Sequence, residues 1–335
     1  MNANKNSLPT RVLGKTGFEV SEVGFGAWAI GGSWGEDVEE AMALAALHAS
    51  IDAGMNFIDT ADVYGGGRSE RLIGKLLRER SERIYVATKM GRSSGWDDSY
   101  ASVERAASSS LKNLGVEILD LVQLHCVSME TMRGPVWEHL ETLKQKGIVR
   151  FYGASVESIE EALHCIKYAN SESSNCATLQ VIFNIFRQRL IAELFPAAQA
   201  ANVGIIARVP LASGILTGKF GKDHRFAADD HRSFNANGEA FNAGETFAGV
   251  PFEKGVEFAE KIRAIVGDSA PLSAQALRWI LDFEAVSTVI PGAKTPAQAG
   301  QNAAASALPR LSEEAHTALE ELYRSEIEPL IRGAY

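Results

Sequence analysis

Residues 119–155 read LDLVQLHCVSMETMRGPVWEHLETLKQKGIVRFYGAS, and they contain the pattern that decides the fold. The apolar runs at 119–125 and 149–155 have the length of buried strands. Between them, residues 131–146 carry apolar side chains at helical spacing, so this part of the chain predicts a strand, a helix and a second strand. Two strands that are joined through a helix pair in parallel, which is typical of an α/β sheet.

The same pattern extends in both directions until it covers most of the chain. Apolar runs that predict strands occur at 23–27, 56–59, 84–89, 119–125, 149–155, 178–184, 204–210 and 285–291. Helix candidates occur near 37–53, 69–80, 99–114, 131–146, 158–169, 189–201, 272–283 and 296–307. Consecutive strand–helix units of this number predict an α/β fold of the (β/α)8 TIM-barrel class. An open, doubly wound sheet is the alternative that the pattern alone leaves.

Three segments lie outside these units. Residues 11–20 predict an N-terminal β-hairpin, and residues 312–327 predict an added C-terminal helix. The irregular insert 220–250 follows the seventh strand, where barrel enzymes place loops over substrate and cofactor. Predicted helix boundaries are Ser99 and Ser158 as N-caps, with Gly54, Gly115 and Gly147 after helix C-termini. We expect residues 1–335 to form a single domain.

Composition limits the classes of partner and compartment. The 335 residues are 46% hydrophobic and 22% charged, which is typical of a globular protein with a large core. The formal net charge of −9 argues against nucleic acid or an anionic membrane as partner. Cys126, Cys165 and Cys176 show no pairing or zinc-binding pattern. Residues 1–9 lack the apolar run of a signal peptide, and no later run approaches the roughly 20 residues that span a bilayer, so we expect a cytoplasmic protein.

Three motif matches are set aside. Residues 24–29 (GFGAWA) match the dinucleotide fingerprint, but that motif requires a helix to follow directly, and residues 30–35 (IGGSWG) intervene. Residues 14–16 (GKT) resemble the end of a P-loop, but Pro9 occupies the position of its first glycine. The acidic and histidine side chains of the insert lack strict ligand spacing, so no metal site is predicted. These side chains are Asp223, His224, Asp229, Asp230 and His231.

Four polar residues stand near neighbouring strand ends, where barrel enzymes carry their catalytic groups. Asp59 ends the second strand, Lys89 the third and His125 the fourth, and Tyr64 lies in the loop after the second strand. Each alone has a structural interpretation, as a helix cap, a surface lysine, a core histidine or a half-buried tyrosine. Their joint placement at one rim favours a catalytic set.

These side chains suit the donation of a proton to a carbonyl oxygen. A phenol has a pKa near 10, and a neighbouring ammonium lowers that pKa by stabilising the phenolate. Lys89 is placed to act on Tyr64 in this way, and the carboxylate of Asp59 would keep Lys89 charged. His125 would hydrogen-bond the substrate oxygen and orient it. The set therefore predicts Tyr64 as the general acid while hydride reaches the carbonyl carbon.

The segments around these residues resemble the aldo-keto reductase family. They are GFGAW at 24–28, NFIDTADVYG at 56–65, ATK at 87–89 and DLVQLH at 120–125, and the likeness covers nearly the whole chain. In that family the matching Asp, Tyr, Lys and His form a catalytic tetrad, and NADP(H) lies extended across the mouth of the barrel. The resemblance implies an NADP(H)-dependent oxidoreductase that reduces aldehydes or ketones to alcohols.

The resemblance also implies a set of cofactor-binding residues. Ser155 and Gln180 match positions that hold the nicotinamide carboxamide, residues 210–219 match the diphosphate loop, and residues 290–302 match the adenine and 2′-phosphate site. The residues carried over are Gly26, Trp28, Ser155, Gln180, Arg208, Pro210, Leu211, Ser213, Gly214, Leu216, Gly218, Lys219, Ile290, Gly292, Lys294, Thr295, Gln298, Gln301 and Asn302.

Three positions depart from the family pattern. Val156 replaces the usual Asn or Asp, and Arg208 replaces an aromatic residue that stacks on the nicotinamide in many relatives. Gln298 stands where some relatives carry arginine, which leaves Lys294 as the only cation of the 2′-phosphate segment. Because Lys294 still supplies a positive charge for the 2′-phosphate, we expect NADPH to be preferred, with NADH as the alternative.

The substrate and the direction of reaction are less defined. Trp28, Trp34 and Phe183 are expected to form substrate walls, and Ile30 and Trp96 are further candidates. One alternative function is an NAD(P)-dependent sugar (aldose) dehydrogenase, and another is a cofactor-sensing regulatory subunit, because relatives of this type associate with ion channels. A barrel isomerase or lyase without nicotinamide binding is a third. The sequence does not indicate an oligomeric state.

Overall fold

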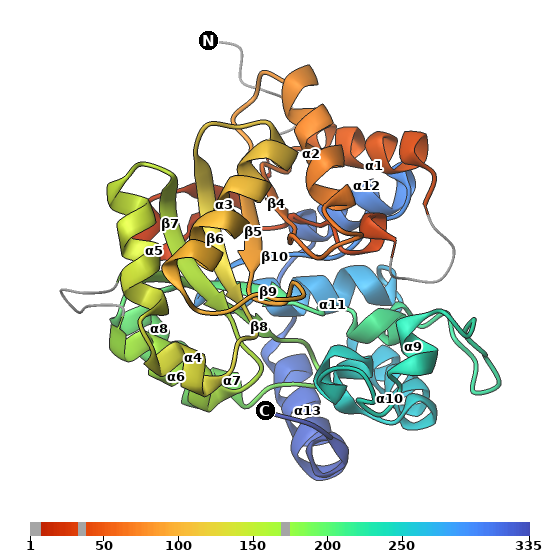
Figure 1. Ribbon diagram of the computed structural model, residues 1–335. Helices are drawn as coiled ribbons and strands as arrows, with labels where there is room; N and C mark the ends of the chain where they lie inside the picture. Colours follow the sequence, from red (N-terminus) through yellow and green to blue (C-terminus); the bar gives the residue numbers. More distant parts are fainter. Residues whose placement is uncertain (1–7, 33–37, 169–174) are drawn as a thin grey trace.

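The structure is a computed structural model that describes residues 8–32, 38–168 and 175–335 (Figure 1). Its strands are β1 (Thr10–Val12), β2 (Glu19–Ser21), β3 (Phe25–Gly26), β4 (Phe57–Asp59), β5 (Tyr85–Met90), β6 (Leu119–His125), β7 (Val149–Ser155), β8 (Cys176–Ile182), β9 (Gly204–Arg208) and β10 (Val286–Val289). Its α-helices are α1 (Glu40–Asp52), α2 (Arg68–Glu79), α3 (Tyr100–Leu114), α4 (Met129–Arg133), α5 (Val136–Gln145), α6 (Ile159–Tyr168), α7 (Leu190–Glu193), α8 (Phe195–Ala200), α9 (His231–Phe234), α10 (Phe252–Val266), α11 (Leu272–Leu281), α12 (Pro296–Ala304) and α13 (Glu313–Leu322).

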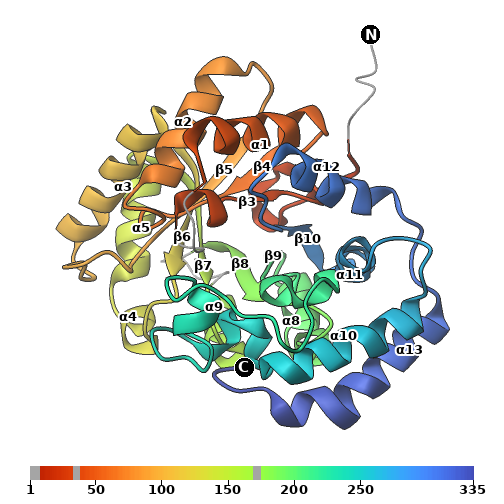
Figure 2. The same ribbon diagram turned by 90° about the vertical axis from the view of Figure 1, so that its right-hand side faces the viewer.

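The parallel sheet is closed into a barrel. Its strand order is β10-β9-β8-β7-β6-β5-β4-β3, and isolated parallel bridges join Val23 to Val289 and Gly26 to Gly292 across the two outer strands. The N–H of Gly24 also donates to the carbonyl of Val289 at 2.8 Å. Figure 2 shows helices arranged around the strands. The predicted (β/α)8 class is therefore confirmed, and the doubly wound alternative is excluded.

The N-terminal hairpin covers the interior of the barrel at the end opposite the site described below. Its strands β1 and β2 pair antiparallel, as predicted. Buried hairpin side chains form one apolar cluster with barrel side chains: Leu13, Phe18 and Val20 with Phe57, Ala87, Leu121, Ile206 and Ile290. At Gly14, φ is +49° and a Cβ would lie 2.2 Å from the backbone nitrogen of Gly204. Only glycine allows the turn to approach the barrel this closely.

Most helix boundaries follow the local signals, with two differences. The side chain of Ser99 caps α3 by accepting from the N–H of Ser102, and Gly115 ends that helix in the left-handed conformation. The helix expected at 131–146 is instead divided into α4 and α5 at Pro135. The helix expected at 189–201 is likewise divided into α7 and α8, with Pro196 in the first turn of α8. A proline disfavours helical conformation in the residue before it and lacks the N–H that would continue the helix.

The part of the chain after β9 contains more structure than expected. The insert forms the short helix α9 and single turns at Ala243–Glu245 and Phe247–Gly249. It is followed by α10, which no prediction included. Near the C-terminus, Ser312 caps α13, and the chain continues beyond Leu322 as a wider turn to Ile327. Among the described residues, none of the helices combines the length and the apolar character needed to cross a bilayer.

Candidate active site

Neighbouring strands deliver three of the four predicted catalytic residues to one rim, and Tyr64 follows in the loop after β4. In the parallel register Asp59 of β4 lies opposite Ala87 of β5, and Lys89 of β5 lies opposite Gln123 of β6. His125 is the last residue of β6. Parallel strands of a barrel end at the same face, so these side chains share the C-terminal rim.

Lys89 is the centre of a buried hydrogen-bond network. Its Nζ donates to Asp59 Oδ2 at 2.6 Å, to the carbonyl of Thr60 at 2.9 Å and to Tyr64 Oη at 3.3 Å. Lys89 is 1% exposed and Asp59 is 3% exposed. Burial alone would lower the pKa of Lys89, but Asp59 and Tyr64 outweigh it and raise the pKa above its ordinary 10.5. The ammonium is therefore charged at neutral pH.

The second oxygen of Asp59 is held by two buried amides. Asp59 Oδ1 accepts from Gln180 Nε2 at 2.6 Å and from Gln123 Nε2 at 3.3 Å. The sequence indicated neither bond. The bond to Asp59 uses one of the two N–H donors of the Gln180 amide, so its second N–H and its side-chain oxygen are left to meet a nicotinamide carboxamide. Gln180 thus links the cofactor region to the ion pair.

Tyr64 and His125 face each other with their rings 5.8 Å apart. The expectation that Lys89 would leave Tyr64 with a lowered pKa is wrong for the free protein. Burial raises the pKa of Tyr64 above 10, and the opposing effect of Lys89 is smaller. Burial, together with the charges of Lys89 and two arginines, lowers the pKa of His125 well below 6.5. Tyr64 is a neutral phenol and His125 a neutral imidazole at neutral pH.

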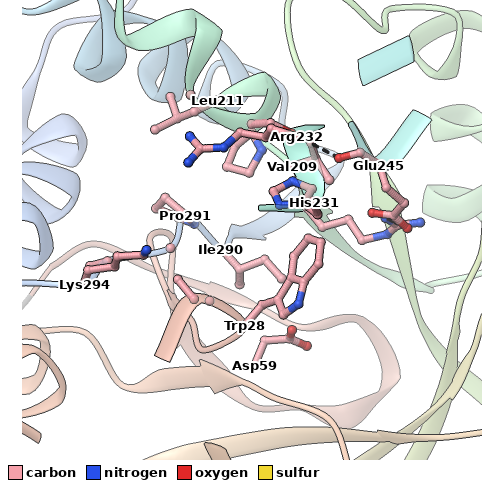
Figure 3. Close-up of a pocket in the computed structure, with 18 of the residues that line it drawn as sticks. Trp28, Asp59, Val209, Leu211, His231, Arg232, Glu245, Ile290, Pro291 and Lys294 are labelled. Carbon is pink, nitrogen blue, oxygen red and sulfur yellow. Dashed lines mark hydrogen bonds and ion pairs between the residues drawn. The ribbon is translucent and has the colours of Figure 1, made fainter. Parts of the chain in front are cut away.

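These side chains open into a cavity of about 670 Å³ (Figure 3). Asp59, Tyr64 and His125 line it, whereas Lys89 does not. The predicted cofactor residues that line it are Gly26, Trp28, Ser155, Gln180, Arg208, Pro210, Leu211, Ser213, Gly214, Lys219, Ile290, Gly292, Lys294, Gln298, Gln301 and Asn302. Its size is that of a small-molecule or cofactor site.

The predicted diphosphate loop turns sharply at the edge of the cavity. Ser213 and Gly214 are consecutive residues with φ of 54° and 98°. The N–H of Gly214 donates to the carbonyl of Leu211 at 2.8 Å, which closes the turn. The side chain of Lys219 lies at the end of this loop and adds a positive charge to the cavity. Lys219 is therefore the group of this loop that favours a cofactor diphosphate.

Several predicted residues lie outside the cavity lining. Phe183 is not a substrate wall, because it is fully buried against Phe195, Trp279 and Phe283. Ile30 is also fully buried, and Trp96 does not line the cavity. Leu216, Gly218 and Thr295 shape the neighbouring loops without lining the cavity. Trp34 falls outside the described residues.

The insert supplies lining residues that no sequence pattern identified. They are Phe220, His231, Arg232, Phe234, Phe241 and Glu245. The His231 ring lies 5.0 Å from that of Trp28, so the insert reaches across to the loop after β3 (Figure 3). Burial lowers the pKa of His231 to about 4. The only earlier signal was the position of the insert after the seventh barrel strand.

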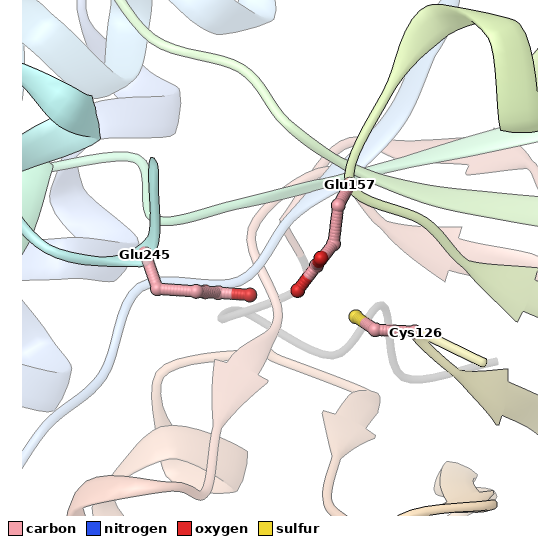
Figure 4. Close-up of side chains that lie close together, drawn as sticks. All are labelled: Cys126, Glu157 and Glu245. Carbon is pink, nitrogen blue, oxygen red and sulfur yellow. The ribbon is translucent and has the colours of Figure 1, made fainter. Parts of the chain in front are cut away.

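Cys126, Glu157 and Glu245 form a cluster whose ligand-type atoms lie within 4.8 Å of one another (Figure 4). Glu157 pairs with Arg92 at 2.9 Å, and Glu245 pairs with Arg208. Burial raises the pKa of the Cys126 thiol to about 11. Since arginines already neutralise both carboxylates and the thiol is protonated, the cluster does not suit a metal ion.

The comparisons agree with this geometry. The profile of the Aldo/keto reductase family matches residues 22–324. An uncharacterized oxidoreductase of Bacillus subtilis (strain 168), YqkF, is 31% identical over 95% of this chain and 97% of its own. A probable voltage-gated potassium channel subunit beta of Oryza sativa subsp. japonica is 30% identical over 87% of this chain and 88% of its own. The glycerol dehydrogenase of Gluconobacter oxydans has a solved structure with a TM-score of 0.77 at 29% identity, covering 96% of each chain. This chain therefore belongs to the aldo/keto reductase family of oxidoreductases.

Proposed function

We propose that the protein is an NADP(H)-dependent oxidoreductase that reduces aldehydes or ketones to alcohols, with Tyr64 as the general acid. The observation that carries this proposal is the buried ammonium of Lys89, held between Asp59 and the phenol oxygen of Tyr64. A positive charge beside a neutral phenol stabilises the phenolate that forms when the phenol donates its proton, so Tyr64 at the mouth of the cavity is suited to act as a proton donor.

The proton chemistry follows from the charges of these groups. Burial keeps Tyr64 protonated, so the proton is available when a carbonyl oxygen gains negative charge. Lys89 Nζ lies 3.3 Å from Tyr64 Oη and stabilises the phenolate that remains after donation. His125 Nδ1 is buried and has no hydrogen-bond partner among the described residues, so the neutral ring can bind the substrate oxygen.

The cavity fits a dinucleotide with its nicotinamide at the tetrad. Gln180 and Ser155 would hold the carboxamide, the loop at 213–214 the diphosphate, and Lys294 the 2′-phosphate. When bound, the reduced nicotinamide supplies the hydride. Arg208 Nε is a buried N–H without a hydrogen-bond partner among the described residues, which leaves a donor for a ligand at this end.

The test is turnover by the purified protein with NADPH and a panel of aldehydes and ketones, followed by cofactor absorbance. Tyr64→Phe removes the proton donor together with one acceptor of Lys89 Nζ, so kcat should fall by about 10²-fold or more. The dissociation constant of NADPH should stay within about twofold, because the phenol is placed for the substrate. Full activity of Tyr64→Phe would refute the role of Tyr64.

A second candidate is a dehydrogenase of sugars or other polyols that works in the oxidative direction. Gln298 favours it, because a neutral amide that accepts from the backbone N–H of Lys294 stands at the expected 2′-phosphate site. The likeness to a glycerol dehydrogenase is further support. Rates in both directions with NADP(H) and NAD(H) distinguish the two. A regulatory subunit, suggested by the likeness to a channel subunit, would bind cofactor but turn over slowly with every substrate.

A further inference from the structure

Arg208 is a buried cation at the end of the cavity where the nicotinamide is proposed to lie. It ends β9, is 7% exposed, and lines the cavity together with Ser155 and Gln180. An oxidised nicotinamide ring carries a positive charge and a reduced ring is neutral. A lone guanidinium at this place would therefore weaken the binding of the oxidised cofactor selectively, since like charges in a poorly hydrated site repel strongly.

Glu245 supplies the opposite charge. Its carboxylate forms an ion pair with Arg208 Nη1, and Arg208 Nη2 donates to the carbonyl of Val156 at 2.9 Å. Glu245 is also 7% exposed and lines the cavity. Burial alone would lower the pKa of Arg208, but the carboxylate of Glu245 outweighs it and the pKa is raised. Arg208 is thus charged, and its ion pair with the carboxylate of Glu245 contributes no net charge to this end of the cavity.

Hydrogen bonds fix the backbone of Glu245 relative to the predicted diphosphate loop. Glu245 ends the turn Ala243–Glu245 of the insert, and its carbonyl accepts from Ser213 Oγ at 3.1 Å. The N–H of Phe247 donates to the same hydroxyl, also at 3.1 Å. These two bonds join the backbone of the insert at Glu245 to the predicted diphosphate loop. The ion pair with Arg208 then holds the carboxylate beside the cofactor site.

We propose that Glu245 determines how this site discriminates between oxidised and reduced nicotinamide, because it cancels the charge of Arg208 beside the ring. This inference rests on the proposed function. Glu245 acts through Arg208 and is a specificity-determining residue with no part in proton transfer. With the pair intact, the oxidised cofactor is bound without a charge penalty, so the enzyme can work in either direction.

The experiment compares the dissociation constants of NADP⁺ and NADPH for purified variants by calorimetry. Glu245→Gln keeps the shape of the side chain but removes the carboxylate that pairs with Arg208, whereas the nearby Glu157 stays paired with Arg92. The ratio Kd(NADP⁺)/Kd(NADPH) should therefore rise about tenfold. Arg208→Met leaves the carboxylate alone, so at mildly alkaline pH the ratio should fall by a similar factor. The double variant, which removes both charges, should return to within about twofold of wild type.

The opposite signs separate charge from structure. Damage to the fold would weaken the binding of both cofactors together. It would not shift the ratio Kd(NADP⁺)/Kd(NADPH) in opposite directions in the two single variants. Glu239→Gln removes a fully exposed carboxylate from the same insert and is the matched control, with an unchanged ratio. If both single variants shift the ratio in one direction, or neither shifts it, the role of Glu245 is refuted. Failure of the wild type to bind either cofactor would instead overturn the proposed function, and this inference with it.

Discussion

The most direct test of the buried network is Asp59→Asn. The substitution keeps the shape of the side chain and removes the only carboxylate among the described residues that contacts Lys89 Nζ. An asparagine also creates a conflict of donors. The amide nitrogen of the asparagine must face either Lys89 Nζ or Gln180 Nε2, because these two donors contact the two oxygens of Asp59 in the wild type. No rotation of the amide satisfies both neighbours.

The expected loss in the free energy of unfolding is about 4 kcal/mol. Removal of one partner of a buried ion pair costs about 3–5 kcal/mol. Lys89 retains the carbonyl of Thr60 and the oxygen of Tyr64 as acceptors, which reduces the loss, whereas the donor conflict with Gln180 adds to it. Asp52→Asn is the control, because Asp52 pairs with Arg80 but is 63% exposed, and we expect no measurable change there.

The assay is urea unfolding at several pH values. In wild type the pKa of Lys89 is raised above 10.5, so the folded state binds this proton more tightly than the unfolded state. That contribution is fully present below about pH 10 and is lost as the pH rises further. In Asp59→Asn, Lys89 is buried without a counter-charge, and burial lowers its pKa. The loss in the free energy of unfolding relative to wild type should therefore shrink as the pH rises from neutral toward 10. A deficit below about 1 kcal/mol that does not vary with pH would refute this account of the network.

Three further predictions concern the fold, a loop carboxylate and the cofactor. Gly14→Ala should lower the free energy of unfolding by about 3 kcal/mol in urea titrations, since φ is +49° and the new Cβ would lie 2.2 Å from the backbone of Gly204. Burial raises the pKa of Asp62 to about 6, so its ionisation opposes folding above that pH. Asp62→Asn should therefore be more stable than wild type by about 2 kcal/mol at neutral pH and equal to it near pH 4, as measured by thermal unfolding. Gln298→Arg should tighten NADPH relative to NADH about fivefold in calorimetry by adding a second cation near Lys294.

The barrel and its rim were predictable because their signals are local. Each strand is a short apolar run, and the polar residue at its end is fixed in space once the strands are parallel. Asp59, Lys89 and His125 could thus be placed together without knowledge of the side-chain contacts. The hairpin and most caps followed from turn and cap residues in the same way.

The errors and omissions arise where position depends on contacts between distant segments. Phe183 follows strand β8, and its sequence position allows the side chain to face either the cavity or the helices. It faces the helices because it packs against Phe195 and Trp279. The lowered pKa expected for Tyr64 considered Lys89 but not burial, which no sequence pattern reports. Lining residues of the insert, such as His231, had no periodic signal at all.

The charges around the cavity differ between its two ends. At the tetrad end, Lys89 and Arg208 are each neutralised by a buried carboxylate, Asp59 and Glu245. In Figure 3, Lys294 lies on the opposite side of the cavity from Glu245. A ligand that is anionic throughout would gain nothing from the neutralised end, and a neutral substrate alone would gain nothing from Lys294. A molecule with phosphates at one end and a ring of variable charge at the other matches both ends, so the charge pattern independently favours a nicotinamide dinucleotide.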